Sequence, residues 1–481
     1  MQNKLVHAAE RAAFKKVLDG LVDKARNGKG EELADNLLNL VGKIQGDSWK
    51  PTSYMALQDI IHNKESKYHK FAMRVIQNTN PNILKTYILN AFYESGFRGY
   101  QTTKEMSAKY NCNIPWVVLI DPTTACNMRC KGCWAAEYGK ALSLTYDELD
   151  DVIMQGKEFG MHAIMFTGGE PMLRKDDIIK LCEKHYDDAF NMFTNATMID
   201  EQFCEDLCRV GNLMVSISVE GFEEANDGRR GQGHYQQVLK AMDLLKAHGI
   251  PFAASICYTS KNYDVVTSDE FLDMLIDKGC IFIWYFHYMP IGNDADVSLL
   301  TNPEQRAYMK KRIREIRDLN TGKEVFALDF QNDGQFVQGC VAGGRIYFHI
   351  NAAGDIEPCA FVHYADSNIR TDRLLDAFQK PLFMAYRQHQ PFNENQLRPC
   401  PMLENPEALR KMVKEESQAH STDLASPEDV DCLCDKTTPY ANAWAEKAEV
   451  LWAEDQAYLK ERAELNDKLR EEAKTKGKKF F

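Results

Sequence analysis

The first hundred residues show hydrophobic positions three and four residues apart, which is the spacing of one face of an α-helix. The clearest runs are Phe14, Val17, Leu18 and Leu21, and then Leu37, Leu38, Val41 and Ile44. Glycine and proline interrupt the pattern at Asn27–Gly30 and Gly46–Pro51, so several helices are expected. Residues 1–112 are predicted to form a helical N-terminal region, which we interpret as a packing cap over the next domain in preference to a separate binding module.

From residue 113 to about residue 325, short β-branched and aromatic runs alternate with amphipathic helical stretches. This alternation is typical of βα units with a parallel sheet. Six strands are expected, at Trp116–Ile120, His162–Thr167, Ala189–Thr194, Leu213–Val219, Pro251–Tyr258 and Ile281–Tyr288. A clear helix follows each of them except the last. The chain is therefore predicted to belong to the α/β class.

Length and composition narrow the class of protein. The 481 residues are enough for two or three domains with ordinary hydrophobic cores. The formal net charge of -12 leaves no basic stripe for phosphate backbones, which excludes a general nucleic-acid surface. No apolar run reaches the roughly 18 residues of a membrane span, so no transmembrane segment is expected. Fourteen cysteines without a signal-peptide pattern indicate a reducing, cytoplasmic location.

Three of those cysteines, Cys126, Cys130 and Cys133, stand close together immediately after the first predicted strand. Thiolates at such spacing suit an iron–sulfur cluster or zinc, and three ligands leave one metal position open. A structural zinc site needs a fourth ligand, and the nearest other thiol, Cys112, precedes the strand without ligand spacing. Three buried core thiols are the other alternative. The open position favours chemistry at the metal.

A second motif, Gly168-Gly169-Glu170-Pro171, follows the second predicted strand. Glycines allow a ligand to approach the backbone, and carbonyl and carboxylate oxygens accept hydrogen bonds from an ammonium group. Alone, such a turn is also explained by an ordinary strand-to-helix connection. Together with the cysteine loop, and in this order, it resembles the radical S-adenosylmethionine (radical SAM) superfamily.

The resemblance implies a fold, two cofactors and a set of site residues. The fold is a partial (β/α)6 TIM-type barrel, with its working residues at the carboxyl ends of the strands. The cofactors are a [4Fe-4S] cluster on the three cysteines and S-adenosylmethionine, which chelates the fourth iron. The expected cofactor contacts are Gly168, Gly169 and Glu170 for the amino group, Ser218 and Arg230 for the carboxylate, and Thr194 and Asn195 for the ribose.

The region after the fourth predicted strand departs from the family pattern. Glu220 stands where the family has an aspartate, so the match at Ser218 is kept but no role is expected for the acid. Arg230 fits the family spacing better than Arg229, although solvated charges explain both arginines equally well. His287 ends the sixth strand and is interpreted as a hydrogen-bonded barrel histidine in preference to a catalytic one.

The C-terminal third carries a second group of cysteines. Two of them flank a predicted β-hairpin and three follow it, an arrangement that resembles the SPASM and twitch auxiliary-cluster domains. The resemblance implies a small domain over residues 326–438 with an auxiliary [4Fe-4S] cluster, and structural zinc is the alternative. The expected ligands are Cys340, Cys359, Cys400 and Cys434, with Cys432 as the alternative to Cys434. Residues 439–481 are predicted to form a charged C-terminal helix.

By the family's mechanism, the reduced cluster passes one electron to the sulfonium, which yields methionine and a 5′-deoxyadenosyl radical. That radical abstracts hydrogen from an unactivated C–H bond, so the chain is predicted to be an enzyme. A flavodoxin or ferredoxin is expected to supply the electron. The substrate is expected to be a peptide, a protein or a small molecule, with a lipid or other hydrocarbon chain as the alternative. Two other functions stay open: a non-catalytic iron–sulfur electron carrier or redox sensor, and a zinc-stabilised partner-binding protein.

Overall fold

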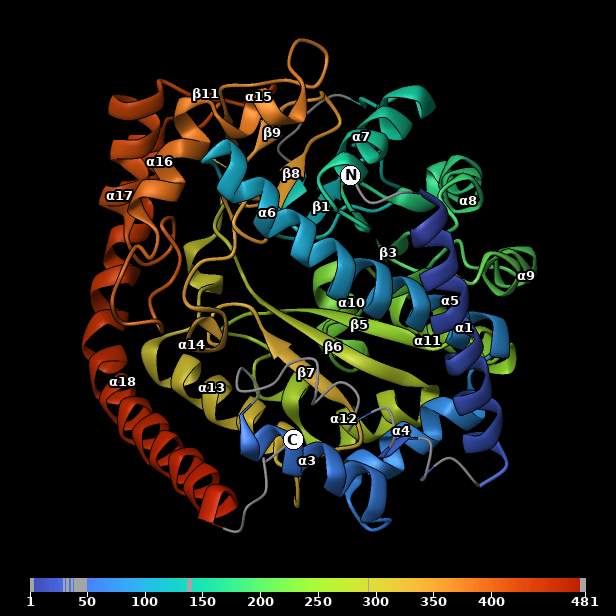
Figure 1. Cartoon of the computed structure of the whole chain (residues 1–481). Helices are drawn as coiled ribbons and strands as arrows, with labels where there is room; N and C mark the ends of the chain where they lie inside the picture. Colours follow the sequence, from blue (N-terminus) through green and yellow to red (C-terminus); the bar gives the residue numbers. More distant parts are fainter. Residues whose placement is uncertain are drawn as a thin grey trace.

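A nine-stranded sheet forms the centre of the molecule, as the computed structural model in Figure 1 shows. The structure describes residues 4–28, 31, 34–35, 38, 50–135, 141–292 and 294–475. All six predicted strands form, as β1 (Val117–Ile120), β2 (Ala163–Phe166), β3 (Ala189–Thr194), β4 (Leu213–Ser218), β5 (Phe252–Tyr258) and β6 (Cys280–His287). Each pairs in parallel with the next one along the chain, which confirms the predicted α/β class.

Three further strands extend the sheet beyond the six that the sequence predicts. These are β7 (Phe326–Asp329), parallel to β6; β8 (Tyr347–Ile350), parallel to β1; and β9 (Ile356–Glu357), antiparallel to β8. The predicted C-terminal hairpin is therefore present as β8 and β9, and it continues the barrel sheet along β1. The backbone groups of β1 are thereby paired on both sides, as a buried strand requires.

Helices connect the strands and cover the sheet. They are α7 (Tyr146–Glu158), η4 (Pro171–Arg174), α8 (Lys175–Lys184), α9 (Glu201–Val210), α10 (Glu223–Arg230), α11 (His234–Ala247), η5 (Val265–Thr267), α12 (Asp269–Lys278), η6 (Val297–Leu299) and α13 (Pro303–Arg317). A capping box starts α7, because the Thr145 hydroxyl accepts from the Glu148 amide and the Glu148 carboxylate accepts from the Thr145 amide. The apolar faces of these helices and the strands form one continuous core.

The helix α13 follows the sixth strand, where the sequence pattern predicts no clear helix. Eight of its fifteen residues are lysine, arginine or glutamate. Only Met309, Ile313 and Ile316 make the apolar stripe that is buried against the core. These positions keep the i, i+4, i+7 spacing of an amphipathic helix, but the surrounding charges conceal it.

The N-terminal helices cover the amino-terminal end of the barrel. They are α1 (Lys4–Arg26), α3 (Pro51–His62), α4 (Lys67–Asn78), α5 (Pro81–Ile88), the π-helix η2 (Leu89–Gly99) and α6 (Tyr100–Tyr110). Arg74 donates hydrogen bonds to the carbonyl oxygens of Cys280 and Glu324, at 3.1 and 2.7 Å, where β6 and β7 begin. The α1 helix ends at the first predicted break and α3 begins at Pro51, whereas residues 46–49 of the second break lie outside the described residues.

The C-terminal segment includes β8 and β9, which form one end of the sheet. Its other elements are α14 (Gly334–Val337), β10 (Tyr364–Ala365), α15 (Leu374–Phe378), α16 (Pro381–His389), α17 (Pro406–Lys411), the π-helix η7 (Met412–Ser417), β11 (His420–Ser421) and α18 (Val430–Thr475). The charged helix expected from residue 439 begins at Val430 and continues through Pro439 along one side of the molecule (red in Figure 1). Arg306 of α13 is fully buried over the ring of Trp444, 4.2 Å from its centroid, which fastens α18 to the barrel.

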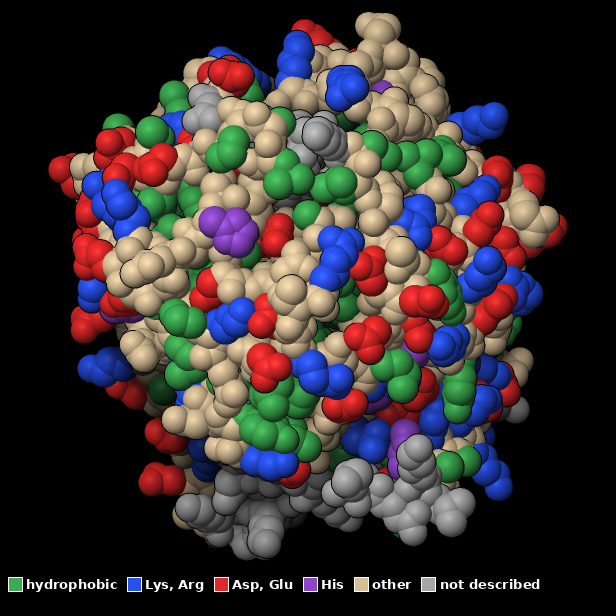
Figure 2. All heavy atoms as spheres, turned by 90° about the horizontal axis from the view of Figure 1, so that it is seen from above, with side chains coloured by type: hydrophobic (Ala, Val, Ile, Leu, Met, Phe, Trp, Pro, Cys, Tyr) green, Lys and Arg blue, Asp and Glu red, His purple; other side chains and the backbone are tan. Residues whose placement is uncertain are grey.

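Figure 2 shows the molecule from above, relative to the view of Figure 1. Acidic and basic side chains are interspersed over this face. This face has no broad basic patch of the kind that a phosphate backbone needs. In the described part of the chain, no helix combines the length and the apolar character that a bilayer span requires.

Candidate functional site

The cysteine loop begins where β1 ends, at the carboxyl end of the parallel sheet. Cys126 is exposed, and Cys130 and Cys133 are partly buried. Burial raises the pKa of Cys126 and Cys130, and the negative charge of Cys133 raises both further. The three thiols therefore form one group whose ionised form a bound cation would stabilise.

The spacing of the sulfur atoms distinguishes an iron–sulfur cluster from zinc. Thiolates that bind one zinc at about 2.3 Å stand about 3.8 Å apart, whereas the corners of a four-iron cluster hold them further apart. Among the described residues, which include all fourteen cysteines, no three cysteine sulfurs lie within 4.8 Å of one another. Three soft thiolates at open spacing fit a cluster better than a preformed zinc site.

The glycine turn after β2 lies directly against the start of the cysteine loop. Gly168 has φ +99°, a conformation that favours glycine. The amides of Gly169 and Glu170 donate to the carbonyl oxygens of Thr123 and Ala125, at 2.9 and 2.8 Å. The two predicted motifs are thus joined by backbone hydrogen bonds.

The Glu170 carboxylate points into the protein and connects β2 to β3. It is 1% exposed, and it accepts hydrogen bonds from the Met172 amide (3.0 Å), the Thr194 hydroxyl (2.6 Å) and the Asn195 amide (2.8 Å). Burial raises its pKa, although these donors lower it in part. The carboxylate that the sequence offers to an ammonium group is therefore used to shape the turn, which leaves backbone oxygens as the acceptors there.

Asn195, directly after β3, is also hydrogen-bonded to the cysteine loop. The Asn195 side-chain amide donates to the Asn127 side-chain oxygen at 2.8 Å, and Asn127 follows Cys126 directly. His234 contacts the Asn195 carbonyl oxygen at 3.0 Å. Thr194 and Asn195 thus lie beside the cysteine loop, and their contact with the ribose stays a prediction, while Asn127 is a positioning residue that the sequence motif does not reveal.

Glu220, for which the sequence predicts no role, fixes two arginines beside the cysteine loop. It is fully buried; its Oε1 accepts from Arg229 and Arg230, both at 2.5 Å, and its Oε2 accepts from the Cys257 amide at 3.0 Å. Burial alone would raise the pKa of Glu220, but the two guanidinium groups lower it, so it is ionised. Arg230 Nη1 in turn lies 3.8 Å from the Cys130 sulfur. The longer glutamate side chain thereby orients positive charge toward the cysteine loop.

Ser218 and Arg229 complete this side of the site. Ser218 is the last residue of β4, partly buried and in register with Ser255 of β5. Arg229 Nη2 donates to the Gly132 carbonyl oxygen at 3.4 Å, and the Arg229 carbonyl oxygen accepts from the Lys131 amide at 2.9 Å. Both arginines border the cysteine loop, so the preference for Arg230 over Arg229 stays a prediction.

His287 is a buried, hydrogen-bonded histidine, as the sequence analysis interprets it. Its Nδ1 donates to the Tyr288 carbonyl oxygen at 2.7 Å, and its Nε2 accepts from the hydroxyls of Thr301 and Tyr440, at 2.7 and 3.1 Å. Burial, with help from the positive charge of Arg306, lowers the pKa of His287 to about 3. The imidazole is therefore neutral in the folded protein.

Because His287 is neutral in the folded protein, we expect the protein to lose stability at acidic pH. The unfolded chain takes up a proton at His287 near pH 6.5, so the folded state loses stability from about pH 6.5 downward to pH 3, by roughly 1.4 kcal/mol per pH unit. Thermal unfolding at pH 7.5 and pH 5.5 measures this loss. His287→Gln should be less stable at pH 7.5 but should lose about 1.4 kcal/mol less between the two values. Equal losses in both proteins would contradict the assignment.

The four predicted auxiliary ligands lie in or against one hydrophobic cluster: Cys434 is buried within it, and Cys340, Cys359 and Cys400 pack against it. Burial raises the pKa of Cys400, and the negative charges of Glu404, Cys340 and Cys359 raise it further. The Cys434 thiol donates to the Pro406 carbonyl oxygen at 3.2 Å, whereas Cys432 is exposed. Burial therefore favours Cys434 over Cys432, and the ligand set stays a prediction.

A buried histidine joins the end of β1 to β9 through two carboxylates. His349 of β8 contacts Asp121, at the end of β1, at 2.9 Å and Glu357 of β9 at 2.5 Å, and all three side chains are fully buried. Burial alone would lower the pKa of His349, but the two carboxylates raise it to about 10. Trp134, next to Cys133, stands edge-on to the His349 ring with centroids 5.8 Å apart. The Asp121–His349–Glu357 group thus supports the first cysteine loop through Trp134.

A further group of potential metal ligands lies at the opposite end of the sheet. His162, Asp187 and Asp188 have ligand atoms within 4.8 Å of one another. The Lys157 ammonium forms ion pairs with both carboxylates, at 2.6 and 3.1 Å. Lysine already supplies the positive charge there, so we assign no metal to this group.

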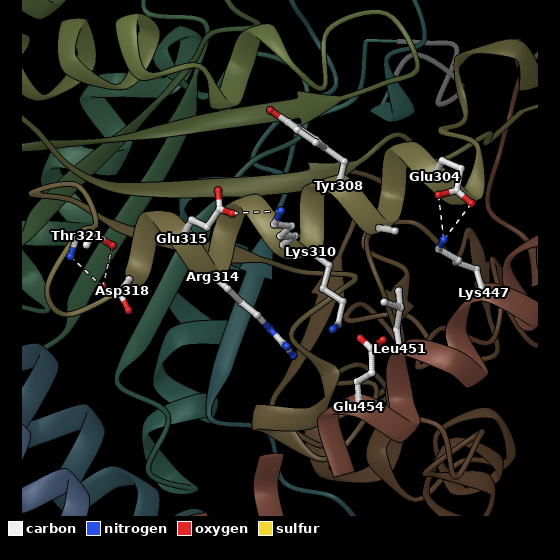
Figure 3. Close-up of a pocket in the computed structure, with 12 residues that line it drawn as sticks. Glu304, Tyr308, Lys310, Arg314, Glu315, Asp318, Thr321, Lys447, Leu451 and Glu454 are labelled. Atoms are coloured by element: carbon white, nitrogen blue, oxygen red, sulfur yellow. Dashed lines mark hydrogen bonds and ion pairs between the residues drawn. The ribbon is translucent and has the colours of Figure 1, made fainter. Parts of the chain in front are cut away.

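A groove of about 690 Å³ lies between α13 and α18, as Figure 3 shows. Its charged side chains pair with one another: Lys447 with Glu304 at 2.9 Å, and Lys310 with Asp455 at 3.0 Å. Neither the cysteine loop nor the glycine turn lines it. We therefore place the functional site at the carboxyl ends of the strands and not in this groove.

Comparison with known proteins supports that placement. The sequence profile of the Radical SAM superfamily matches residues 120–275, which run from the last residue of β1 into α12 and include the cysteine loop, the glycine turn, Ser218 and Arg230. An uncharacterized protein of Archaeoglobus fulgidus is 28% identical over 260 residues, which are 50% of this chain and 60% of that protein. The Fe-coproporphyrin III synthase of Methanosarcina barkeri is 27% identical over 241 residues, 46% of this chain and 57% of that enzyme. Less than two thirds of each relative's length is thus matched.

Solved structures show the shared fold. Streptococcus suis SuiB bound to S-adenosylmethionine superposes with a TM-score of 0.54 at 17% identity, over 73% of this chain and 90% of SuiB. SuiB bound to its precursor peptide SuiA gives the same TM-score, over 75% and 91%. With the cysteine loop, the glycine turn and the parallel sheet in the same order along the chain, these findings show that the protein belongs to the radical SAM superfamily.

Proposed function

We propose that the protein is a radical SAM enzyme that cleaves S-adenosylmethionine reductively and abstracts hydrogen from an unactivated C–H bond of its substrate. The observation that carries the proposal is the pairing of the Gly169 and Glu170 amides with Thr123 and Ala125, which builds one site from two motifs. When bound, the cluster and S-adenosylmethionine supply the electron and the radical. The protein holds, orients and shields them.

The residues of the site divide this work. Cys126, Cys130 and Cys133 are the proposed ligands of the [4Fe-4S] cluster. Gly168 and Gly169 are the proposed backbone contacts of the amino group of S-adenosylmethionine, and because neither has a Cβ the turn packs directly on the start of the cysteine loop. Arg230 and Ser218 are the proposed partners of its carboxylate, since a guanidinium group is well suited to a carboxylate. Glu170, Thr194 and Asn195 act by holding the turn in this shape.

An auxiliary [4Fe-4S] cluster in the C-terminal region is part of the proposal. Cys340, Cys359 and Cys400 support it, because these partly buried thiols pack against one cluster of side chains and can ionise together only when a cation balances their charge. An external donor such as a flavodoxin or ferredoxin is the proposed source of electrons. All fourteen cysteines are free thiols, which suits a reducing, cytoplasmic location.

The proposed substrate is a peptide, a protein or a small molecule, part of which enters the barrel. Phe193 of β3 meets Trp284 and Phe286 of β6, with ring centroids 6.0 and 6.1 Å apart, and all three side chains are only partly buried. Because β4 and β5 separate these strands in the sheet, such contacts form only on its concave face. That face suits an apolar or aromatic group. A structural neighbour was solved with a precursor peptide, and one relative is named for an iron porphyrin.

The same concave face favours a second candidate, a lipid or other hydrocarbon chain. A partly open aromatic surface gives an alkyl chain dispersion contacts without demanding hydrogen bonds. The abstracted hydrogen ends in 5′-deoxyadenosine, so a deuterium-labelled peptide and a deuterium-labelled alkyl chain separate the two candidates once cleavage is established. The general assay therefore comes first.

That assay is anaerobic reconstitution with iron and sulfide, reduction by dithionite, and measurement of 5′-deoxyadenosine from S-adenosylmethionine without substrate. We expect 5′-deoxyadenosine from the native chain and none from Cys130→Ala, which lacks one ligand of the proposed cluster. Cys182→Ala, a buried thiol away from both sites, is the matched control and should behave as the native chain. A reconstituted protein that binds iron but neither binds nor cleaves S-adenosylmethionine would favour the electron-carrier function instead.

A further inference from the structure

The side chains of β3, β4, β5 and β6 alternate between the two faces of the sheet. One set packs under the helices in the main hydrophobic core, as do Phe190, Val215, Ala254 and Ile283. The other set, which we call the concave wall, carries no aspartate, glutamate, lysine, arginine or histidine in these four strands, all of which the structure describes. Among its aromatic and small apolar residues stand the uncharged polar residues Asn191, Ser216, Ser218 and Ser255. The concave wall is therefore neutral but not purely apolar.

The aromatic part of the concave wall continues to the cysteine loop. The ring centroid of Phe286 lies 6.3 Å from that of Phe361, which in turn lies 5.8 Å from that of Trp134. Trp134 directly follows Cys133. All three rings are only partly buried, so part of each surface stays accessible. An apolar group that packs on the wall can therefore lie next to the proposed cluster ligands.

Two N–H groups of the concave wall are buried without an acceptor. The indole Nε1 of Trp284 has no hydrogen-bond partner among the described residues. Asn191 is 5% exposed, and its Oδ1 accepts from the Ser216 hydroxyl at 2.9 Å, which leaves its Nδ2 without a partner in the same part of the chain. A buried donor without an acceptor destabilises the protein, and an acceptor on a bound molecule removes that cost. Both groups therefore point to a ligand that carries acceptor oxygens.

Trp284 stands level with a proposed cofactor contact. Ser218 of β4 is in register with Ser255 of β5, and Ser255 is in register with Trp284 of β6. Two strand spacings, about 10 Å, therefore separate Ser218 from Trp284. Asn191 lies two residues before Phe193 on the same face of β3, and the ring centroids of Phe193 and Trp284 are 6.0 Å apart. Both N–H groups thus belong to the wall beside the place proposed for S-adenosylmethionine.

We propose that the concave wall binds an uncharged carbonyl group carried by an apolar ring or chain, with the N–H groups of Trp284 and Asn191 donating to carbonyl oxygens of the substrate. The inference rests on the proposed function, because it assigns a substrate chemistry to the same site. A peptide presents such a group as an amide beside an apolar side chain, and an acyl lipid presents it as an ester. A carboxylate finds no cation on this wall, and a bare hydrocarbon leaves both N–H groups unpaired.

The test measures the binding of small probes to the full-length reconstituted chain by equilibrium dialysis, with and without S-adenosylmethionine. N-acetyl-phenylalaninamide offers an aromatic ring with amide carbonyls, methyl hexanoate offers an alkyl chain with an ester carbonyl, and propylbenzene offers a ring without an acceptor. The carbonyl probe that binds more tightly to the native chain identifies the source, an amide for a peptide and an ester for an acyl lipid. Tighter binding of hexanoate than of methyl hexanoate would contradict an uncharged site.

Two variants remove the donors while keeping an apolar wall. Trp284→Phe keeps an aromatic ring without the N–H group, and Asn191→Leu replaces the amide by an apolar side chain of similar size. Each should weaken the binding of the carbonyl probe about tenfold and that of propylbenzene less than about twofold. Trp116→Phe is the matched control, because the Trp116 N–H group already donates to the Ser95 carbonyl oxygen at 2.9 Å. It should change the binding of none of the probes.

The outcomes separate this inference from the proposed function. Equal weakening of the carbonyl probe and propylbenzene in Trp284→Phe and Asn191→Leu overturns the hydrogen bonds and leaves only an apolar wall. A native chain that binds none of the probes overturns the site altogether. The dialysis needs no cleavage of S-adenosylmethionine, so selective binding without 5′-deoxyadenosine formation would keep the carbonyl site and overturn the proposed enzyme.

Discussion

Gly169→Ala is expected to lower 5′-deoxyadenosine formation at least a hundredfold. A Cβ at this position would stand 2.6 Å from the carbonyl carbon and oxygen of Thr124 and would also overlap the carbonyl oxygen of Ala125. These atoms are backbone and cannot rotate away, so the strand that enters the cysteine loop has to shift. Displacement of reacting groups by about 1 Å is enough for a hundredfold loss. The turnover and the affinity for S-adenosylmethionine, measured by equilibrium binding, report the effect.

The matched control is Gly20→Ala in α1, where a Cβ meets no atom within 4 Å. This variant should retain full activity, and it should be slightly more stable, since alanine favours a helix over glycine. Iron content should stay near that of the native chain in both variants if the change at Gly169 acts on cofactor geometry. Native activity in Gly169→Ala would show that the contact between the two motifs is not needed for cleavage.

His349→Gln is expected to lower the free energy of unfolding by about 3–5 kcal/mol at pH 7, because it leaves Asp121 and Glu357 as buried charges without a cation. The pKa of His349 is raised to about 10, so its stabilising contribution is complete below pH 6.5 and declines as the pH rises toward 10. The native chain should therefore lose stability between pH 7 and pH 9, whereas His349→Gln should lose much less over that range. Thermal unfolding of both proteins at the two pH values measures the difference.

His420→Gln is the control, because His420 is exposed in the short strand β11. Its stability should follow that of the native chain at both pH values. A His349→Gln variant with native stability at pH 7 would contradict the stabilising role of His349 between Asp121 and Glu357.

The sequence predicted the six strands well because each one is a short β-rich run between polar turns, and buried parallel strands leave that local signature. The cysteine loop and the glycine turn were also predictable, since both are contiguous motifs. The profile match confirms the family, while the roles of the individual residues stay predictions.

Other features depend on contacts between distant parts of the chain. The pairing of β8 with β1 leaves no local signal, and neither does the contact of Glu220 with two arginines from the following helix. The start of α18 at Val430 was missed because Pro439, a usual helix breaker, lies inside it. The direction of the Cys434 thiol is likewise set by tertiary packing against Pro406. A sequence pattern reports local preference, and these features are decided by partners elsewhere.

The pairing of β1 with β8 also sets how long β1 waits for its partner strand during synthesis. Val117 and Tyr347, which are partners in this ladder, are 230 residues apart. At about 5–20 residues per second, a ribosome needs roughly 10 to 50 s to add the second strand after the first. Throughout that interval one edge of β1, which leads into the cysteine loop, has no partner and is open to wrong pairing. The nascent chain is thus open to aggregation after its cysteine loop has been made and before β8 covers the free edge of β1.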